Sequence, residues 1–444
     1  MSGKRQANEA SSIWRAPILF GLVAILFILE GTTRNAMFSG SWNTSLTILN
    51  MGLISAIMAL GVNMQWGYAG LFNAGVVGFV ALGGLAPVLI AMPPVEGAWG
   101  AGGPRLLLGL AIGVLAVIAA IIAYQRGGRF RTPLMVVTLL VGLWLYRTTF
   151  TPAADAIEAF SQAGYLGGLG LPVVLSWPVG ALFAAIAAWC IGKVALGLRS
   201  DYLAIATLGI AEIIVAVMRN EEWLARGVNN VTGIPRPVPY EINLQRDPEF
   251  VEWVGRWGFN AAEGSAVYVK LIYAGMFAAV LVGVILLAEL ALKSPWGRMM
   301  RAIRDNETAA RAMGKDVTGR HLQIFVIGSA VIGLAGAMMI TMDGLVSPGS
   351  YIPLRFTFLI WVMVIVGGSG NNWGAALGAI LIWFLWLKAE VWGPALISLL
   401  STPLPAGEFK AALLERSAHM RFVAMGLVLL LVLRFAPRGL LPEK

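Results

Sequence analysis

The stretch YVKLIYAGMFAAVLVGVILLAELAL, residues 268–292, decides the fold. A helix needs about 20 mostly apolar residues to cross the hydrocarbon core of a bilayer, and this stretch exceeds that length. Its charged residues are Lys270, near one end, and Glu289, near the other. Because backbone groups inside a membrane must be hydrogen-bonded within the chain, the stretch predicts a membrane-spanning helix.

Apolar stretches recur along the whole chain. The stretches at 68–90, 203–218 and 356–367 are glycine-rich or short, which is typical of broken or re-entrant helices. Hydrophobic residues make up 58% of the 444 and charged residues 12%, against about 25% charged in soluble proteins. The sequence therefore predicts an all-α, polytopic transmembrane helical bundle of about 10–12 membrane segments, some broken or re-entrant. The candidate segments are 17–33, 46–63, 68–90, 106–124, 133–150, 173–192, 203–218, 268–292, 323–342, 356–367, 374–392 and 421–436.

Basic residues in the loops predict the orientation. Lys and Arg concentrate on the cytoplasmic side of bacterial-type membranes. Alternating crossings place all the basic clusters on one side, with both termini cytoplasmic in a bacterial inner membrane. The net charge of +9 then follows from topology and does not indicate nucleic-acid binding. The clusters are Lys4, Arg5 and Arg15; Arg126, Arg129 and Arg131; Lys193 and Arg199; the basic residues of 293–320; and Arg434, Arg438 and Lys444.

The same topology divides the chain into three parts. These are a cytoplasmic N-terminal tail (1–16), a transmembrane domain (17–436) and a cytoplasmic C-terminal tail (437–444). The domain contains a long cytoplasmic segment at 293–320 and an acidic, tryptophan-bearing periplasmic loop at 219–267. Two interpretations of that loop remain open: its tryptophans anchor at the lipid interface, or the loop is a platform for a soluble partner.

Catalytic and metal-binding patterns are absent from the sequence. It has no phosphate-binding loop of the form G-x-x-x-x-G-K-[ST], no G-x-S-x-G elbow and no H-E-x-x-H or C-x-x-C pair. One cysteine and two histidines offer few ligands to zinc or iron. We therefore expect this chain to be no enzyme, to bind no cofactor and to hold no metal.

The cytoplasmic stretch SPWGRMMRAIRDNETAARAMGKDVTGR, residues 294–320, is too polar to span a membrane. Ser294 and Asn306 are suited to cap two successive helices, and Gly314 is suited to end the second. Arg298, Arg301 and Arg304 recur on the polar face of the first helix. The segment is either a docking surface for another protein or an ordinary amphipathic interfacial loop. The docking residues would be Ser294, Pro295, Gly297, Arg301, Ala302, Asn306, Glu307, Ala309, Ala310 and Gly314.

Ala309, Ala310 and Gly314 match the spacing of the coupling loop of ABC importer permeases, although Glu307 stands one residue earlier than that pattern has its acid. GRMMRAIRDNETAARAMGKDV (297–317) and VIVGGSGNNWGAALGAI (364–380) resemble the branched-chain amino acid ABC permease family. So do GYAGLFNAGVVGFVALGG, RSDYLAIATLGIAEII, FVIGSAVIGLAGAM and RFAPRGLL, in family order. The chain is similar to the second, longer permease subunit of such systems.

The resemblance implies that several different subunits carry out transport together. A periplasmic solute-binding protein would deliver the solute, and a second permease subunit would complete the pathway in the lipid membrane. Two cytoplasmic ABC ATPase subunits would bind ATP and Mg and act on residues 294–314. The leading function is import of branched-chain or related hydrophobic amino acids. Import of urea or short-chain amides is an alternative, and an ion-coupled secondary transporter is a less favoured one.

Polar residues within the membrane segments are candidates for the substrate pathway. Glycine-rich breaks expose backbone groups to a solute, and an ionisable residue in an apolar run defaults to a functional hypothesis. Asn73/Gly75 and Asn372/Gly374 hint at an internal repeat. Close helix packing through small residues is the alternative explanation of the breaks. The candidates are Asn73, Thr207, Glu212, Ser369, Asn371 and Asn372.

Overall fold

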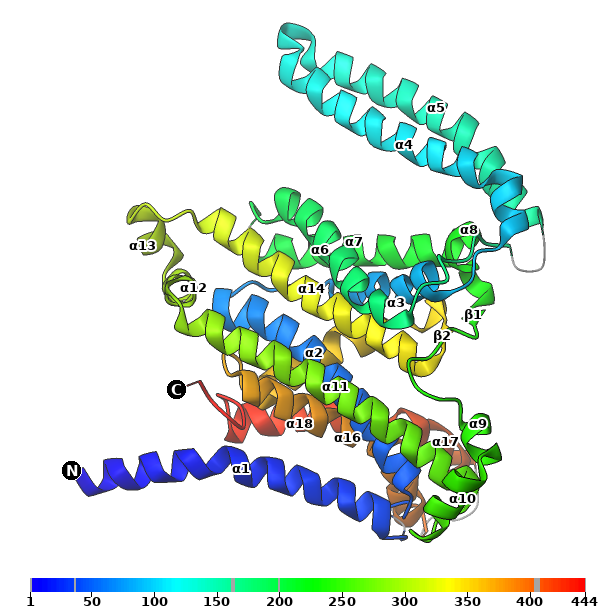
Figure 1. Ribbon diagram of the computed structural model, residues 1–444. Helices are drawn as coiled ribbons and strands as arrows, with labels where there is room; N and C mark the ends of the chain where they lie inside the picture. Colours follow the sequence, from blue (N-terminus) through cyan, green and yellow to red (C-terminus); the bar gives the residue numbers. More distant parts are fainter. Residues whose placement is uncertain (1, 36, 161–163, 199, 403–407, 444) are drawn as a thin grey trace.

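The computed structural model describes residues 2–35, 37–160, 164–198, 200–402 and 408–443. Arg199 and Lys444, two members of the predicted basic clusters, lie outside the described residues. The described chain is a bundle of helices (Figure 1). Within it, nine helices are long and apolar enough to cross a membrane. They are α1 (Ser2–Thr32, apolar from Trp14), α2 (Trp42–Ala69), α4 (Glu96–Arg126), α5 (Arg131–Phe160), α6 (Ser176–Ala195), α7 (Ser200–Asn220), α11 (Ala261–Lys293), α14 (Val317–Asp343) and α16 (Asn372–Leu400).

Shorter helices account for the remaining predicted segments. α3 (Val76–Ala91) follows a break in the chain, and α15 (Leu359–Gly367) follows a π-helical turn, η5 (Leu354–Phe358). α17 (Glu408–Arg416) and α18 (Met420–Phe435) end the bundle. A helix therefore lies at each of the twelve predicted segments. The expectation of short or broken helices is confirmed for α3 and α15, whereas α7 is unbroken over its whole length.

The boundary predicted at residue 63 is wrong, because α2 continues to Ala69. Polar residues at 63 and 65 ended the apolar run in the sequence. Asn63 and Gln65 are nevertheless fully buried and hydrogen-bonded to other helices, so the helix passes through them without exposing a polar group to lipid.

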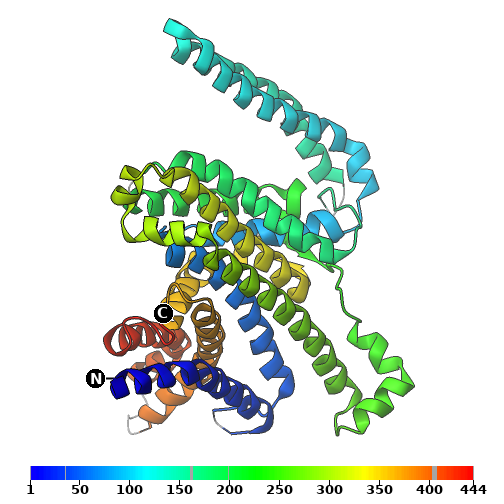
Figure 2. The same ribbon diagram turned by 60° about the vertical axis from the view of Figure 1, so that its left-hand side comes forward.

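α2 lies at the centre of the bundle. It packs against α14, α16 and α11, and in its most apolar window 89% of the residues are buried. The α4–α5 hairpin differs, since it extends away from the bundle (Figures 1 and 2) and its main packing is of α4 on α5. The core of the fold is thus built around one helix.

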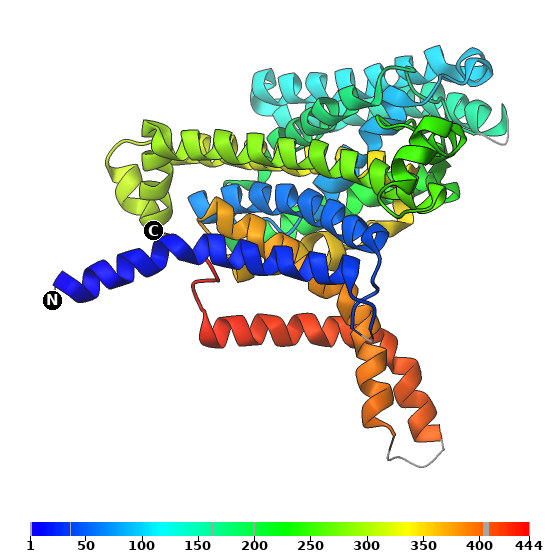
Figure 3. The same ribbon diagram turned by 60° about the horizontal axis from the view of Figure 1, so that its bottom comes forward.

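Both chain termini lie at the end of the bundle that carries α12 (Pro295–Asp305) and α13 (Glu307–Ala312) (Figures 1 and 3). We name this the inner end. The small helices α8 (Glu222–Ala225), α9 (Glu241–Arg246) and α10 (Pro248–Gly255) lie at the opposite, outer end. This arrangement agrees with an even number of crossings.

A two-stranded antiparallel sheet joins two outer-end segments. β1 (Val231–Thr232) comes from the loop between α7 and α11, and β2 (Leu345–Val346) directly follows α14. Val231 pairs with Val346 and Thr232 with Leu345. The long outer loop is therefore attached to the end of α14.

Two glycine-rich breaks meet at the inner end of α2. The first, residues 70–75, begins with Gly70 at φ 69° and separates α2 from α3. The second, residues 368–371, separates α15 from α16, and Gly368 and Gly370 have φ of 119° and 84°. A Cβ on Gly67 would lie 2.5 Å from the Gly370 nitrogen, so only glycine allows this approach.

Candidate functional site

The inner-end segment folds as its capping residues predict. Ser294 Oγ accepts a hydrogen bond from the Gly297 N–H at 3.4 Å, and Pro295 occupies the first position of α12. Asn306 Oδ1 accepts from the Ala309 N–H at 2.9 Å and begins α13. Gly314, at φ 75°, follows the end of that helix. The predicted pair of short helices is confirmed.

This pair of helices has a small apolar core of its own. Ile303, Ala310 and Val317 are buried against one another, with Met299 packed beside them. Ala302 and Ala309 are exposed, and Met313 is 79% exposed. The alanines of the predicted docking surface therefore differ, because Ala310 stabilises the segment from within while Ala302 and Ala309 are available to a partner.

Arg304 departs from the prediction that three arginines share a polar face. Its guanidinium turns inward, donates to the Gly67 carbonyl at the end of α2, and donates to Glu443 Oε2 at 2.8 Å. Burial alone would lower the pKa of Arg304, but the hydrogen bonds and charges of Glu443 and Asp305 together outweigh burial and raise that pKa. α12 is thus connected directly to the central helix.

The C-terminal tail completes this connection. The backbone N–H groups of Leu440 and Leu441 donate to the carbonyls of Val366 and Gly367, at 2.8 and 2.9 Å. Asn371 Nδ2 donates to the Pro442 carbonyl at 3.4 Å. The tail therefore links the second break to Arg304, while Ser369 is exposed beside it.

A buried hydrogen-bond network lies between the second break and α2. Asn372 Oδ1 accepts from Asn63 Nδ2 at 3.2 Å and from the Tyr68 hydroxyl. Asn372 Nδ2 donates to Glu289 Oε1 at 2.9 Å, and Asn63 Oδ1 accepts from the Gly370 N–H at 2.8 Å. Asn372 thus joins α2, α11 and α16 and is committed to other groups of this chain.

A second network holds the first break. Asn73 Nδ2 donates to Gln65 Oε1, and Asn73 Oδ1 accepts from the Gly75 N–H, both at 2.9 Å. Thr207 Oγ1, on α7, accepts from the Ala74 N–H at 3.1 Å. At the second break, Asn371 Oδ1 likewise accepts from the N–H two residues on, that of Trp373, at 3.1 Å.

Several residues of these networks are absent from the sequence-based candidates. They are Asn63, Gln65, Tyr68 and Glu289, together with Ser329, whose Oγ accepts a hydrogen bond from Gln65 Nε2 at 3.0 Å. Polar side chains in a membrane helix face the protein interior or a water-filled cavity. Asn63 and Gln65 lie at the end of an apolar run, so that rule was the available signal for them.

Glu212 is exposed, unlike the buried candidates Asn73, Thr207 and Asn372. It lies near the middle of α7 and its side chain is exposed, whereas Ala211 and Val215 on the same helix are buried against the bundle. A carboxylate facing lipid at this depth costs several kcal/mol, roughly 2.5 or more. The outward face of α7 is therefore suited to water or to another protein chain.

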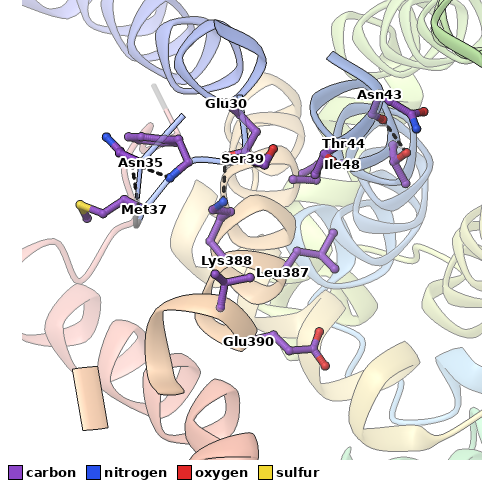
Figure 4. A pocket seen from close by; sticks show the side chains of 13 residues that line it. Glu30, Asn35, Met37, Ser39, Asn43, Thr44, Ile48, Leu387, Lys388 and Glu390 are labelled. Carbon is purple, nitrogen blue, oxygen red and sulfur yellow. Dashed lines mark hydrogen bonds and ion pairs between the residues drawn. The ribbon is translucent and has the colours of Figure 1, made fainter. Parts of the chain in front are cut away.

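The outer end contains a cavity of about 560 Å³ between α1, α2 and α16 (Figure 4). Glu30 Oε2 and Lys388 Nζ lie 2.8 Å apart on its wall, with side chains 0% and 5% exposed. Ser39 Oγ donates to Glu30 Oε1 at 2.6 Å. Since each charge has a partner within the chain, this pair fastens α1 to α16 and leaves no free charge for a solute.

No group of three or more His, Cys, Asp or Glu side chains that could hold a metal ion occurs among the described residues. Across that part of the chain, the networks consist mainly of amides, hydroxyls and backbone groups. Such groups hold helices in place or line a passage. The long apolar helices, the breaks and the inner-end segment together define a multi-pass membrane protein.

Comparisons with known proteins place this membrane protein in a permease family. The profile of the branched-chain amino acid transport system permease component matches residues 44–433. The chain belongs to this family, whose members are ABC transporter permeases for amino-acid transport. No solved structure matches the chain.

Curated relatives extend the comparison. The probable branched-chain amino acid transport permease protein LivM of Methanocaldococcus jannaschii is 26% identical over 90% of this chain and 93% of its own length. The LivM permease of the Escherichia coli high-affinity branched-chain amino acid transport system is 30% identical over 50% of this chain and 52% of its own length. The xylose transport system permease protein XylH of Escherichia coli is 23% identical over 82% of each chain. The chain is therefore a transport subunit.

Proposed function

We propose that this chain is the inner-membrane permease subunit of an ATP-driven importer and forms the pathway for branched-chain or related hydrophobic amino acids. One observation carries the proposal: Arg304 connects the exposed inner-end segment to the end of α2, where both helix breaks meet. A partner that binds α12 and α13 is therefore connected, through Arg304, to the two breaks, the part of the bundle best able to change shape.

The partners follow from the family. Two cytoplasmic ABC ATPases bind ATP and Mg and dock on the exposed residues of α12 and α13. A second permease subunit lies beside this chain in the membrane, and a periplasmic solute-binding protein docks at the outer end, with both termini on the cytoplasmic side. ATP binding can shift the orientation of the pathway only if the ATPases contact α12 and α13 differently in the two states.

The pathway surface is the outward face of α7, around Glu212. Hydrogen bonds within the chain occupy the side chains of Asn73, Thr207 and Asn372, so these residues position the breaks. Glu212 is exposed and unsuited to lipid. The second permease subunit would cover this face and enclose an aqueous passage between the two chains.

The solute class rests on the names of the relatives, which specify branched-chain amino acids in LivM and xylose in XylH. Urea or short-chain amides remain the second candidate. An ion-coupled secondary transporter is less favoured because it would leave the inner-end segment without a role.

The function is tested by uptake of labelled leucine, glutamate and urea into vesicles containing the complete complex, with and without ATP. We expect ATP-dependent uptake of leucine. ATP-dependent uptake of urea alone would select the alternative, and leucine uptake driven by an ion gradient without ATP would refute the importer.

The coupling segment is tested by Ala309→Arg, because Ala309 is exposed on α13 and a bulky cation would block a close approach. Solute-stimulated ATP hydrolysis and uptake should fall at least about tenfold, the equivalent of about 1.4 kcal/mol. Ala262→Arg, on an exposed site at the outer end of α11, is the matched control for membrane insertion and for assembly with the ATPase subunits. Normal coupling in Ala309→Arg would refute the assignment.

A further inference from the structure

A second cavity, of about 640 Å³, lies at the inner end. Its walls come from α1, α11, α12, the second break and the C-terminal tail. Three cationic side chains line it: Arg15 from α1, Lys293 from the end of α11 and Arg301 from α12. Segments far apart in the sequence thus bring their positive charges to one place.

The cations of this cavity outnumber its unpaired carboxylates. Among the described residues, Arg15, Lys293 and Arg301 form no ion pair. Two carboxylates also line the cavity: Glu443 pairs with Arg304, whereas Glu289 keeps its charge while accepting a hydrogen bond from Asn372, so three cations face one unpaired carboxylate. The cavity therefore offers cations to an anion from outside the chain.

Aromatic residues place the cavity at the level of lipid headgroups. Trp14, next to Arg15, is 66% exposed, and Trp373, on the cavity wall, is 46% exposed. The Trp373 ring packs edge-on against Phe20 of α1, with ring centroids 6.2 Å apart. Tryptophans concentrate at the membrane–water interface, so the cationic wall faces headgroups and the apolar rings face the start of the acyl chains.

We propose that this cavity binds the phosphodiester headgroup of an anionic phospholipid of the inner leaflet, of the phosphatidylglycerol class. Basic cavities between membrane helices on the cytoplasmic side are suited to such headgroups. The site is independent of the solute carried. Because Arg301 belongs to α12, the bound headgroup lies against the same short helix that carries Arg304, and the lipid supports the position of that helix.

The test is direct binding of phosphatidylglycerol to the assembled complex, measured by native mass spectrometry after transfer from nanodiscs of phosphatidylcholine containing phosphatidylglycerol. Arg15→Gln/Lys293→Gln removes two cations from the cavity wall. We expect its affinity for phosphatidylglycerol to fall about 25-fold, at about fivefold for each cation removed near a membrane surface. Arg298→Gln/Lys315→Gln removes the same charge from exposed inner-end positions outside the cavity and should leave the affinity unchanged.

Three results would overturn the proposal. Equal affinity in the cavity variant and the control would show that the cations only set the topology. Displacement of phosphatidylglycerol by millimolar inorganic phosphate would assign the cavity to a small soluble anion. Binding to the permease that disappears once the ATPase subunits are added would assign it to the protein interface. Uptake assays do not enter this test, so its failure would leave the proposed transport function intact.

Discussion

α2 and the α4–α5 hairpin are both long and apolar, yet they occupy opposite positions in the molecule. Buried residues make up 89% of the most apolar window of α2, against 17% and 11% in the spans of α4 and α5. α4 is the more hydrophobic helix, but it lies at the periphery. Hydrophobicity therefore identifies a membrane helix without showing whether lipid or protein surrounds it.

The polar residues of α2 mark the difference. Asn50, Asn63 and Gln65 are fully buried and each donates a hydrogen bond to another helix. The spans of the hairpin instead carry exposed residues such as Leu115 and Trp144. In a membrane helix, an amide group thus indicates a protein neighbour, whereas an unbroken apolar surface indicates lipid or a partner subunit.

The largest expected effect comes from breaking the buried ion pair of the packed region. Lys388→Met leaves Glu30 charged and without its partner, and should lower the free energy of unfolding by about 3–5 kcal/mol. The measurement is reversible unfolding of the purified chain in mixed micelles. Glu30→Gln/Lys388→Met removes both charges and should recover most of the loss; an equal loss in the double variant would show that the charges are not coupled.

A smaller effect comes from adding one methyl group to each region. On Gly61 of α2, a Cβ would lie 2.5 Å from the Gly328 carbonyl oxygen, so Gly61→Ala should cost about 1–3 kcal/mol of unfolding free energy. On Gly100 of α4, nothing lies within 4 Å, and Gly100→Ala should be neutral or stabilise by up to about 1 kcal/mol. Equal effects in the two variants, measured by the same unfolding assay, would remove the distinction between the regions.

The smallest effect is expected on the surface of the hairpin. Leu115 is exposed on α4, and Leu115→Ala should change the unfolding free energy by less than about 0.5 kcal/mol. Leu60→Ala, at a fully buried site on α2, is the matched comparison and should cost about 2–5 kcal/mol. A large loss in Leu115→Ala within the assembled complex alone would identify the hairpin as a subunit contact.

Local signals in the sequence predicted the local structure well. The apolar runs located the helices, and Ser294, Asn306 and Gly314 predicted the ends of α12 and α13, because capping depends on residues three or four positions apart. Long-range pairing was not predictable in this way. Arg304 and Glu443 stand on segments far apart in the sequence, and only packing shows that Arg304 turns inward.

The same limit applies to the candidate site. Residue type singled out Asn73, Thr207 and Asn372 as polar groups in membrane segments, and all three are buried at the breaks. Residue type does not say whether such a group faces a solute or a neighbouring helix. Thr207 and Glu212 lie on the same helix, and only the packing of α7 shows that Thr207 faces the first break whereas Glu212 faces outward.

The short sheet of β1 and β2 connects the outer loop mechanically to the end of α14. Val231 and Thr232 belong to the loop that leads to α9 and α10, and their partners directly follow α14. α14 runs the length of the bundle back to α13. A force on the outer loop would therefore pass through the backbone hydrogen bonds of this sheet to α14, and along α14 to α13 at the inner end.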